Sequence, residues 1–155
     1  MNFQDGGIMQ TKSEFLKKAY SNYQILAALP AICVIIDYAL TFFLAGDTSM
    51  ITSWEASPFV RFAVIHNVMA AYLLGIVLFY YVAAYAVLRV LHNTVYYKFG
   101  VLLIVLLSVT HVLGGMSWFF RTATYSNGIF ILSLLSIVIA FIAFGFSLLH
   151  EKTPA

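Results

Sequence analysis

Four long apolar stretches, separated by short polar segments, dominate the sequence. They cover residues 25–45, 59–88, 100–120 and 128–149. Each is long enough to cross the hydrocarbon core of a bilayer, which takes about 20 helical residues. Helices are expected because isolated strands facing lipid would leave backbone groups without hydrogen bonds. The second stretch is the longest, and we expect it to tilt or to project beyond the membrane. The pattern predicts an all-α, four-helix transmembrane bundle that forms a single domain over residues 1–155.

The composition supports this interpretation. The chain is 63% hydrophobic and 9% charged, with a formal net charge of +2. Soluble domains carry about 25% charged residues, so this chain lacks the polar groups needed to cover a soluble globule. The small net charge gives no indication of a nucleic-acid partner. The single cysteine, Cys33, lies in an apolar stretch, which excludes an intrachain disulfide and a Cys-x-x-Cys metal site.

The basic residues are distributed unevenly between the two sides of the predicted bundle. One side carries Lys12, Lys17, Lys18, Arg89, Lys98 and Lys152. The other side carries Arg61 and Arg121. Positively charged loops stay in the cytoplasm, so the distribution predicts a multi-pass cell-membrane protein with both termini cytoplasmic. A cleaved signal peptide is a poorer explanation of the first stretch, which is too long and contains Asp37.

The segment before the first stretch contains a helix start signal. Residues 11–14 read T-K-S-E, which is a capping-box pattern. The apolar residues that follow are spaced as on one face of a helix. We expect either a short helix at the membrane interface or a frayed tail.

Three ionisable residues interrupt the apolar stretches, although each such group costs a few kcal/mol in hydrocarbon. A helical rise of about 1.5 Å per residue places Asp37, His66 and His111 all about 12–13 Å below the non-cytoplasmic ends of their helices. Gly114 and Gly115 follow His111 and permit a neighbouring helix to approach closely. The sequence therefore predicts a polar pocket in the outer half of the bilayer.

Further polar residues extend this predicted pocket. Glu55 precedes Pro58, where the second helix is expected to begin. It either stabilises the helix N-terminus through the dipole or turns inward over Asp37. Supporting polar contacts are expected from Thr41, Arg61, Asn67 and Thr110. The fourth stretch offers serines that can bond their own backbone, and we expect it to serve packing and lipid contact.

Three functions are compatible with this cluster, and the residues leave open whether the protein is an enzyme. The cluster can be a hydrogen-bonded network that orders the helices of a small subunit or scaffold, with other membrane subunits or a second copy as partners. Alternatively, Asp37, His66, His111 and Glu55 bind a divalent metal such as zinc. Glu55 would then be a ligand or the general base of a metal-dependent hydrolase. In the third hypothesis, His66 and His111 ligate a b-type haem for electron transfer.

The first half of the chain also resembles a known family. The residues are "DYALT", then Gly46, then "EASP". They resemble the pattern Asp-x-x-x-Thr … Gly … Glu-x-Asn-Pro of a family of small, uncharacterised prokaryotic and archaeal multi-span membrane proteins, a domain of unknown function. Asp37, Thr41, Gly46, Glu55 and Pro58 match the pattern, and Ser57 replaces its asparagine. The resemblance implies a helical membrane fold and a site built on the aspartate and the glutamate, without a known activity.

Overall fold

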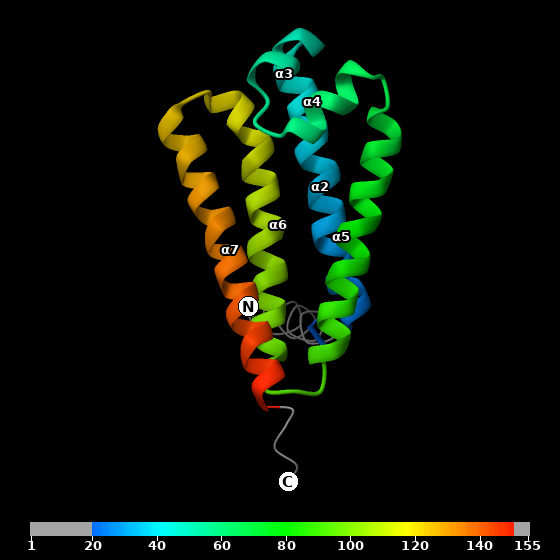
Figure 1. Ribbon diagram of the computed structural model, residues 1–155, viewed down its shortest axis with the longest axis vertical. Helices are drawn as coiled ribbons and strands as arrows, with labels where there is room; N and C mark the ends of the chain where they lie inside the picture. Colours follow the sequence, from blue (N-terminus) through cyan, green and yellow to red (C-terminus); the bar gives the residue numbers. More distant parts are fainter. Residues whose placement is uncertain (1–19, 151–155) are drawn as a thin grey trace, which may run out of the picture.

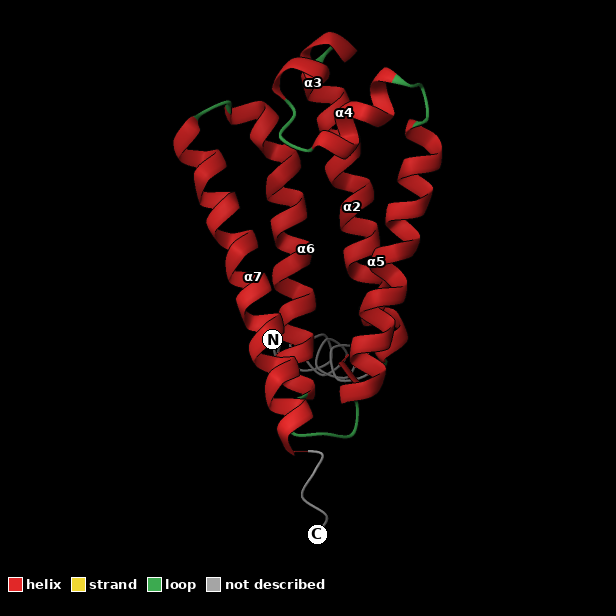
Figure 2. Ribbon diagram, viewed as in Figure 1, coloured by secondary structure: helices red, strands yellow, loops and turns green. Residues whose placement is uncertain are grey.

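The described part of the protein is entirely helical. The computed structural model describes residues 20–150, but not the side chains of residues 143, 144 and 146–150. Within this range it contains four long helices: α2 (Tyr23–Ala45), α5 (Met69–Leu91), α6 (Tyr97–Phe120) and α7 (Ala123–His150). Two short helices, α3 (Thr48–Trp54) and α4 (Pro58–Ile65), lie between α2 and α5 (Figures 1 and 2). The predicted all-α fold is confirmed; the helix expected after Thr11 lies outside the described residues.

Four helices are long and apolar enough to cross a membrane. The candidate spans are Tyr23–Ala45, Met69–Leu91, Tyr97–Phe120 and Ala123–Ile142. Large apolar side chains are exposed along them, as at Phe43 (83%), Leu74 (72%) and Phe141 (76%). Lipid-facing surfaces have this character, whereas soluble monomers rarely expose so much contiguous apolar surface. The fold is that of an integral membrane protein.

The helices pack as a row rather than as a symmetrical square. α2 packs closely against both α6 and α5, and α7 packs against α6. Figure 1 shows α7, α6, α2 and α5 running side by side, with α3 and α4 covering one end. The start of α2 and the end of α7 lie at the other end (Figure 1). We call these the α3–α4 end and the opposite end.

Local sequence signals determine where the helices begin. The Asn22 side chain accepts hydrogen bonds from the backbone N–H groups of Gln24 (3.1 Å) and Ile25 (3.3 Å), which caps α2. Asp47 caps α3 in the same way, through Met50 N at 2.9 Å. Such caps satisfy N–H groups that the helix itself leaves without acceptors. Between α2 and α3, Gly46 has a φ of 85°, and this left-handed turn redirects the chain across the α3–α4 end.

The second predicted span, residues 59–88, is wrong as a single helix. The chain forms α4, breaks, and then begins the spanning helix α5 at Met69. At the break, Asn67 has a φ of 56°. Asparagine tolerates this left-handed conformation better than most residues, and it ends a helix. α4 is therefore part of the cover over the bundle, and α5 alone spans.

Two buried clusters hold the bundle together. The larger one lies toward the opposite end and comprises Ala27, Ala84, Leu88, Leu91, Tyr97 and Ile104. The smaller one joins α2, α3 and α4 and comprises Ala45, Ile51 and Val60. The smaller cluster fixes the α3–α4 cover over the end of the bundle, and the candidate site lies beside it.

Candidate functional site

An acid and a histidine meet between α2 and α6. Asp37 Oδ2 lies 2.9 Å from His111 Nδ1, and each side chain is 19% exposed. This contact is an ion pair when the imidazole is protonated and a hydrogen bond when Nδ1 alone carries the proton. Either form lowers the free energy needed to place Asp37 within a membrane-spanning helix.

The glycines after His111 make this contact possible. A Cβ atom on Gly115 would lie 2.8 Å from the backbone O of Asp37 and 2.9 Å from Leu40 Cβ. A Cβ atom on Gly114 would lie 3.5 Å from Asp37 Oδ2. α2 and α6 thus approach at a separation that a larger residue at 115 would not allow, which confirms the predicted interhelical role of this glycine pair.

Tyrosines surround the pair on the side of α5. The Tyr80 ring stands edge-on to the His111 ring, with 4.7 Å between centroids. Nearby, the hydroxyl groups of Tyr38 and Tyr72 are hydrogen bonded at 3.0 Å. The contact with His111 places Tyr80 of α5 against the site.

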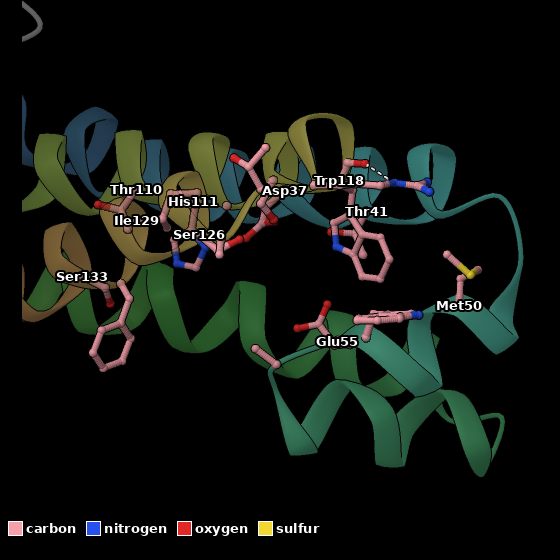
Figure 3. A pocket seen from close by; sticks show the side chains of 18 residues that line it. Asp37, Thr41, Met50, Glu55, Thr110, His111, Trp118, Ser126, Ile129 and Ser133 are labelled. Carbon is pink, nitrogen blue, oxygen red and sulfur yellow. Dashed lines mark hydrogen bonds and ion pairs between the residues drawn. The ribbon is translucent and has the colours of Figure 1, made fainter.

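The pair opens onto a pocket of about 830 Å³ at the α3–α4 end. α2 contributes Asp37 and Thr41 to its walls, and α6 contributes Thr110, His111, Gly114, Ser117 and Trp118. The remaining walls are Met50, Trp54, Glu55 and Ala56 from α3 and its loop, and Arg121, Thr122, Ala123, Ser126, Ile129, Phe130 and Ser133 from the α6–α7 connection and α7. Figure 3 shows Asp37 and His111 pointing toward one another on one side and Glu55 across the cavity from Thr41. The volume lies within the range typical of small-molecule sites.

Glu55 fulfils both roles considered for it. Its Oε1 accepts a hydrogen bond from the backbone N–H of Ser57, the cap of α4, at 3.0 Å, and its side chain also lines the pocket. Burial raises the pKa of Glu55 above its ordinary value, and the negative charge of Asp37 raises it further. Its hydrogen bonds with Ser57 N, the Trp118 side chain and Ala56 N oppose this rise. The raised pKa indicates that the pocket disfavours a second negative charge.

The two arginines near the site do not pair with its acids. Arg121 has a φ of 48°, and its Nε and Nη2 donate to the backbone oxygens of Trp118 (2.8 Å) and Leu44 (2.9 Å). These bonds tie the end of α6 to the end of α2. Arg61 forms no ion pair with Asp37 or Glu55 within the described residues.

The structure places His66 away from the other predicted site residues. It follows the last residue of α4, is exposed, and packs its ring on Phe62 with 4.2 Å between centroids. Neither His66 nor Asn67 lines the pocket. His66 fails to share the depth of Asp37 because α4 ends there and the membrane span starts later. His111 lines this pocket and His66 does not, so the pocket does not bring together the two imidazoles that the haem hypothesis needs.

The predicted metal site is not supported either. Among residues 20–150, no group of three or more His, Cys, Asp or Glu side chains has a geometry that would hold a metal ion. Asp37 and His111 remain as a pair, with Glu55 across the pocket. Thr110, expected to join their network, bonds the backbone O of Leu106 at 2.8 Å instead.

Sequence reasoning missed the contribution of α7. Ser126 and Ser133 line the pocket, although we had assigned this helix to packing and lipid contact. Ser136, one turn from Ser133, does bond its own helix, through Leu132 O at 3.0 Å. The nearest sequence signal is the i, i+7 spacing of Ser126 and Ser133, which places both on one face.

Fold and site together define a four-span helical membrane protein with a partly polar pocket at one end of its bundle. No family model, curated protein sequence or solved structure matches the chain. The resemblance on Asp37, Thr41, Gly46, Glu55 and Pro58 therefore stays a prediction.

Proposed function

We propose that the protein is a small ligand-binding subunit of the cell membrane, with both termini in the cytoplasm and the α3–α4 end facing outside. Its pocket takes a small amphipathic molecule in the outer half of the bilayer. The observation that carries this proposal is the pocket itself, in which Asp37, His111 and Glu55 share one cavity with apolar side chains of α7.

The shape of the walls supports an amphipathic ligand. The polar groups come from α2, α6 and the loop before α4, whereas Ile129 and Phe130 continue the cavity along α7. Phe130 is 70% exposed at this boundary. Sites for small molecules combine a largely apolar wall with a few placed polar groups, and this pocket has that composition. The resemblance to the Asp-and-Glu family pattern adds support, because both matching acids line the cavity.

Tryptophan fluorescence provides a direct test. Both tryptophans of the chain, Trp54 and Trp118, line the pocket, so the intrinsic emission reports on its occupancy. The protein in lipid nanodiscs is titrated with octyltrimethylammonium, octyl glucoside and octyl sulfate. We expect a saturable change with at least one probe, whereas partition into lipid alone gives a non-saturating drift.

A filled pocket provides the matched control. Ser133→Phe places a ring inside the cavity, whereas Leu134→Phe places one on the neighbouring exposed position, outside it. The saturable change should vanish in the first variant and persist in the second. Equal behaviour of the two variants, or no saturation with any probe, would refute the binding function.

A scaffold role without a ligand is the second candidate. It is favoured by the close α2–α6 contact at Gly115, which together with the Asp37–His111 pair fixes the position of the two helices. The exposed apolar face of α7 would then contact other membrane subunits or a second copy. In that case Ser133→Phe leaves co-purification with partners unchanged, and Asp37→Ala disrupts it.

A further inference from the structure

Apart from Asp37 and His111, the charged groups that face the pocket do not pair with one another. Asp37 is engaged with His111, and the guanidinium of Arg121 donates to two backbone oxygens. Glu55 has hydrogen-bond donors around it but forms no ion pair within residues 20–150. The charge that acts on it is the negative one of Asp37. The cavity thus offers a carboxylate without a cationic partner.

Aromatic rings stand beside this carboxylate. Trp118, on the last turns of α6, lines the cavity and is hydrogen bonded to Glu55. Trp54, the residue before Glu55, also lines the cavity and is exposed. The face of an indole ring attracts cations, and organic ammonium groups are commonly recognised by such rings together with a carboxylate. A hydrated inorganic ion gains less here, because the described residues lack a set of metal ligands.

The cavity also has room for an apolar chain. From Ser126 to Ser133 the α7 wall extends roughly 10 Å along the helix, at about 1.5 Å per residue. Ile129 and Phe130 lie within this wall. Among the described residues, α6 is the one helix against which α7 packs closely. A short alkyl chain of about this length can therefore lie against Ile129 and Phe130.

We propose that the pocket binds an organic ammonium ion with an apolar tail, the ammonium group held by Glu55 and the two tryptophans and the tail along α7. This proposal rests on the binding function proposed above and names the chemical class of its ligand. The ammonium group supplies the positive charge that Glu55 lacks, and the tail covers the apolar wall of α7.

The test compares head groups and then removes the acid. In nanodiscs of zwitterionic lipid, octyltrimethylammonium should bind at least about tenfold more tightly than octyl glucoside and octyl sulfate. Glu55→Gln keeps the size and the hydrogen-bond acceptor but removes the charge, and should weaken octyltrimethylammonium about tenfold while leaving octyl glucoside unchanged. Asp47→Asn is the matched control, because it removes one negative charge at the same end of the protein from a residue outside the pocket. It should leave binding unchanged.

The outcomes separate this proposal from the one on which it rests. Saturable binding that Ser133→Phe abolishes, but without preference for the ammonium probe, overturns the ligand class and keeps the pocket. If Glu55→Gln and Asp47→Asn weaken octyltrimethylammonium binding equally, the ligand class is also overturned, because the loss then reflects the surface charge and not the pocket. Absence of saturable binding by all three probes overturns both proposals. The unfolding midpoint of Glu55→Gln shows that the variant is folded.

Discussion

The two ends of the bundle each hold a histidine among aromatic rings, but they use it differently. At the α3–α4 end, His111 contacts the carboxylate of Asp37 and faces a cavity. At the opposite end, His92 contacts the Asn93 side chain (3.0 Å) and the backbone O of Ser21 (3.3 Å). Its ring lies between those of Tyr23 and Tyr97, with centroids 5.0 and 5.2 Å away. At one end the histidine has a charged partner and faces the pocket, and at the other end its partners are neutral.

The comparison separates a candidate site from ordinary packing. At the opposite end, Tyr97 is 7% exposed and its hydroxyl donates to Tyr20 O at 2.7 Å, so the polar groups there are satisfied within the protein. At the α3–α4 end, Glu55 retains a carboxylate without a cationic partner among the described residues. A histidine alone does not indicate function; a histidine paired with a half-buried acid beside a cavity does so more strongly.

Replacing Gly115 at the α3–α4 end and Gly100 at the opposite end should give the largest difference in stability between the two ends. Gly115→Ala places a Cβ atom against the Asp37 backbone, which cannot move without shifting α2. Gly100→Ala places one 2.9 Å from Leu91 Cδ1, the tip of a flexible side chain. We expect the free energy of unfolding, measured in detergent, to fall by about 1–3 kcal/mol in Gly115→Ala and by under about 1 kcal/mol in Gly100→Ala.

Gly75→Ala is the control, because a Cβ atom there meets nothing within 4 Å. Its stability should equal or exceed that of the unmodified protein, since alanine favours a helix over glycine. Equal losses from Gly115→Ala and Gly100→Ala would show that α2 and α6 are not in tight backbone contact at the candidate site.

The Asp37–His111 contact should give the next largest effect. Asp37→Ala leaves an imidazole without its partner, and we expect a loss of about 1–3 kcal/mol. A double-mutant cycle with His111→Ala should give a coupling energy of about 1 kcal/mol, as for hydrogen bonds between membrane helices. The cycle is measured by reversible unfolding in mixed micelles.

The parallel experiment at the opposite end is His92→Ala combined with Asn93→Ala. The amide partner carries no charge and both side chains lie near the end of the bundle, so the coupling should be smaller. A coupling at His92 that matches the one at His111 would remove the distinction between the two histidines.

The extent to which the site could be read from the sequence is clearest from these same residues. The meeting of Asp37 and His111 was predictable, because both interrupt apolar stretches at equal depth and glycines follow one of them. The position of His66 was not, since the prediction assumed one continuous helix. The left-handed φ of Asn67 breaks that helix, and a single asparagine in a long apolar stretch indicates such a break only weakly.

The walls of the pocket were still harder to predict. Ser133 and Ser136 lie on the same helix, yet one lines the cavity and the other bonds its own backbone. Which of the two serines faces the cavity depends on how α7 is rotated against α6, and no local sequence pattern specifies that rotation. Three of the four spans were predictable from apolar length alone, because the bilayer imposes that length. The second was not, because its apolar stretch also contains the short helix α4.

Removal of the Tyr97 hydroxyl tests the packing at the opposite end. Tyr97→Phe deletes the hydrogen bond to Tyr20 O while keeping the ring, and leaves a backbone oxygen that can bind water. We expect a loss of at most about 1 kcal/mol. Tyr125→Phe provides the counterpart near the α3–α4 end, where the hydroxyl donates to Leu113 O at 3.1 Å. Binding of octyltrimethylammonium should be unchanged in Tyr97→Phe; a weakened affinity would mean that the two ends are coupled.

The smallest effects concern two acids at the α3–α4 end whose pKa values shift in opposite directions. Burial, and then the charge of Asp37, raise the pKa of Glu55 above its ordinary 4.5. The folded state therefore favours the neutral acid, and the stability this gives is lost as the pH rises through the raised pKa. Hydrogen bonds from the Ser49 hydroxyl and then Met50 N lower the pKa of Asp47 below 3.8. Its contribution is present at neutral pH and is lost as the pH falls through the lowered pKa.

Unfolding midpoints from pH 3 to pH 8 should show these opposite signs. Glu55→Gln should match the unmodified protein in acid and become the more stable of the two at neutral pH, because it has no charge to bury. Asp47→Asn should be the less stable variant at neutral pH, with the difference shrinking in acid. Each variant shares all its other titrating groups with the unmodified protein. The difference between their unfolding midpoints therefore reports on the one acid that was replaced. If Glu55→Gln instead lowers the midpoint at neutral pH as Asp47→Asn does, Glu55 is a solvated helix cap, and the pocket lacks the free negative charge that distinguishes it from the opposite end.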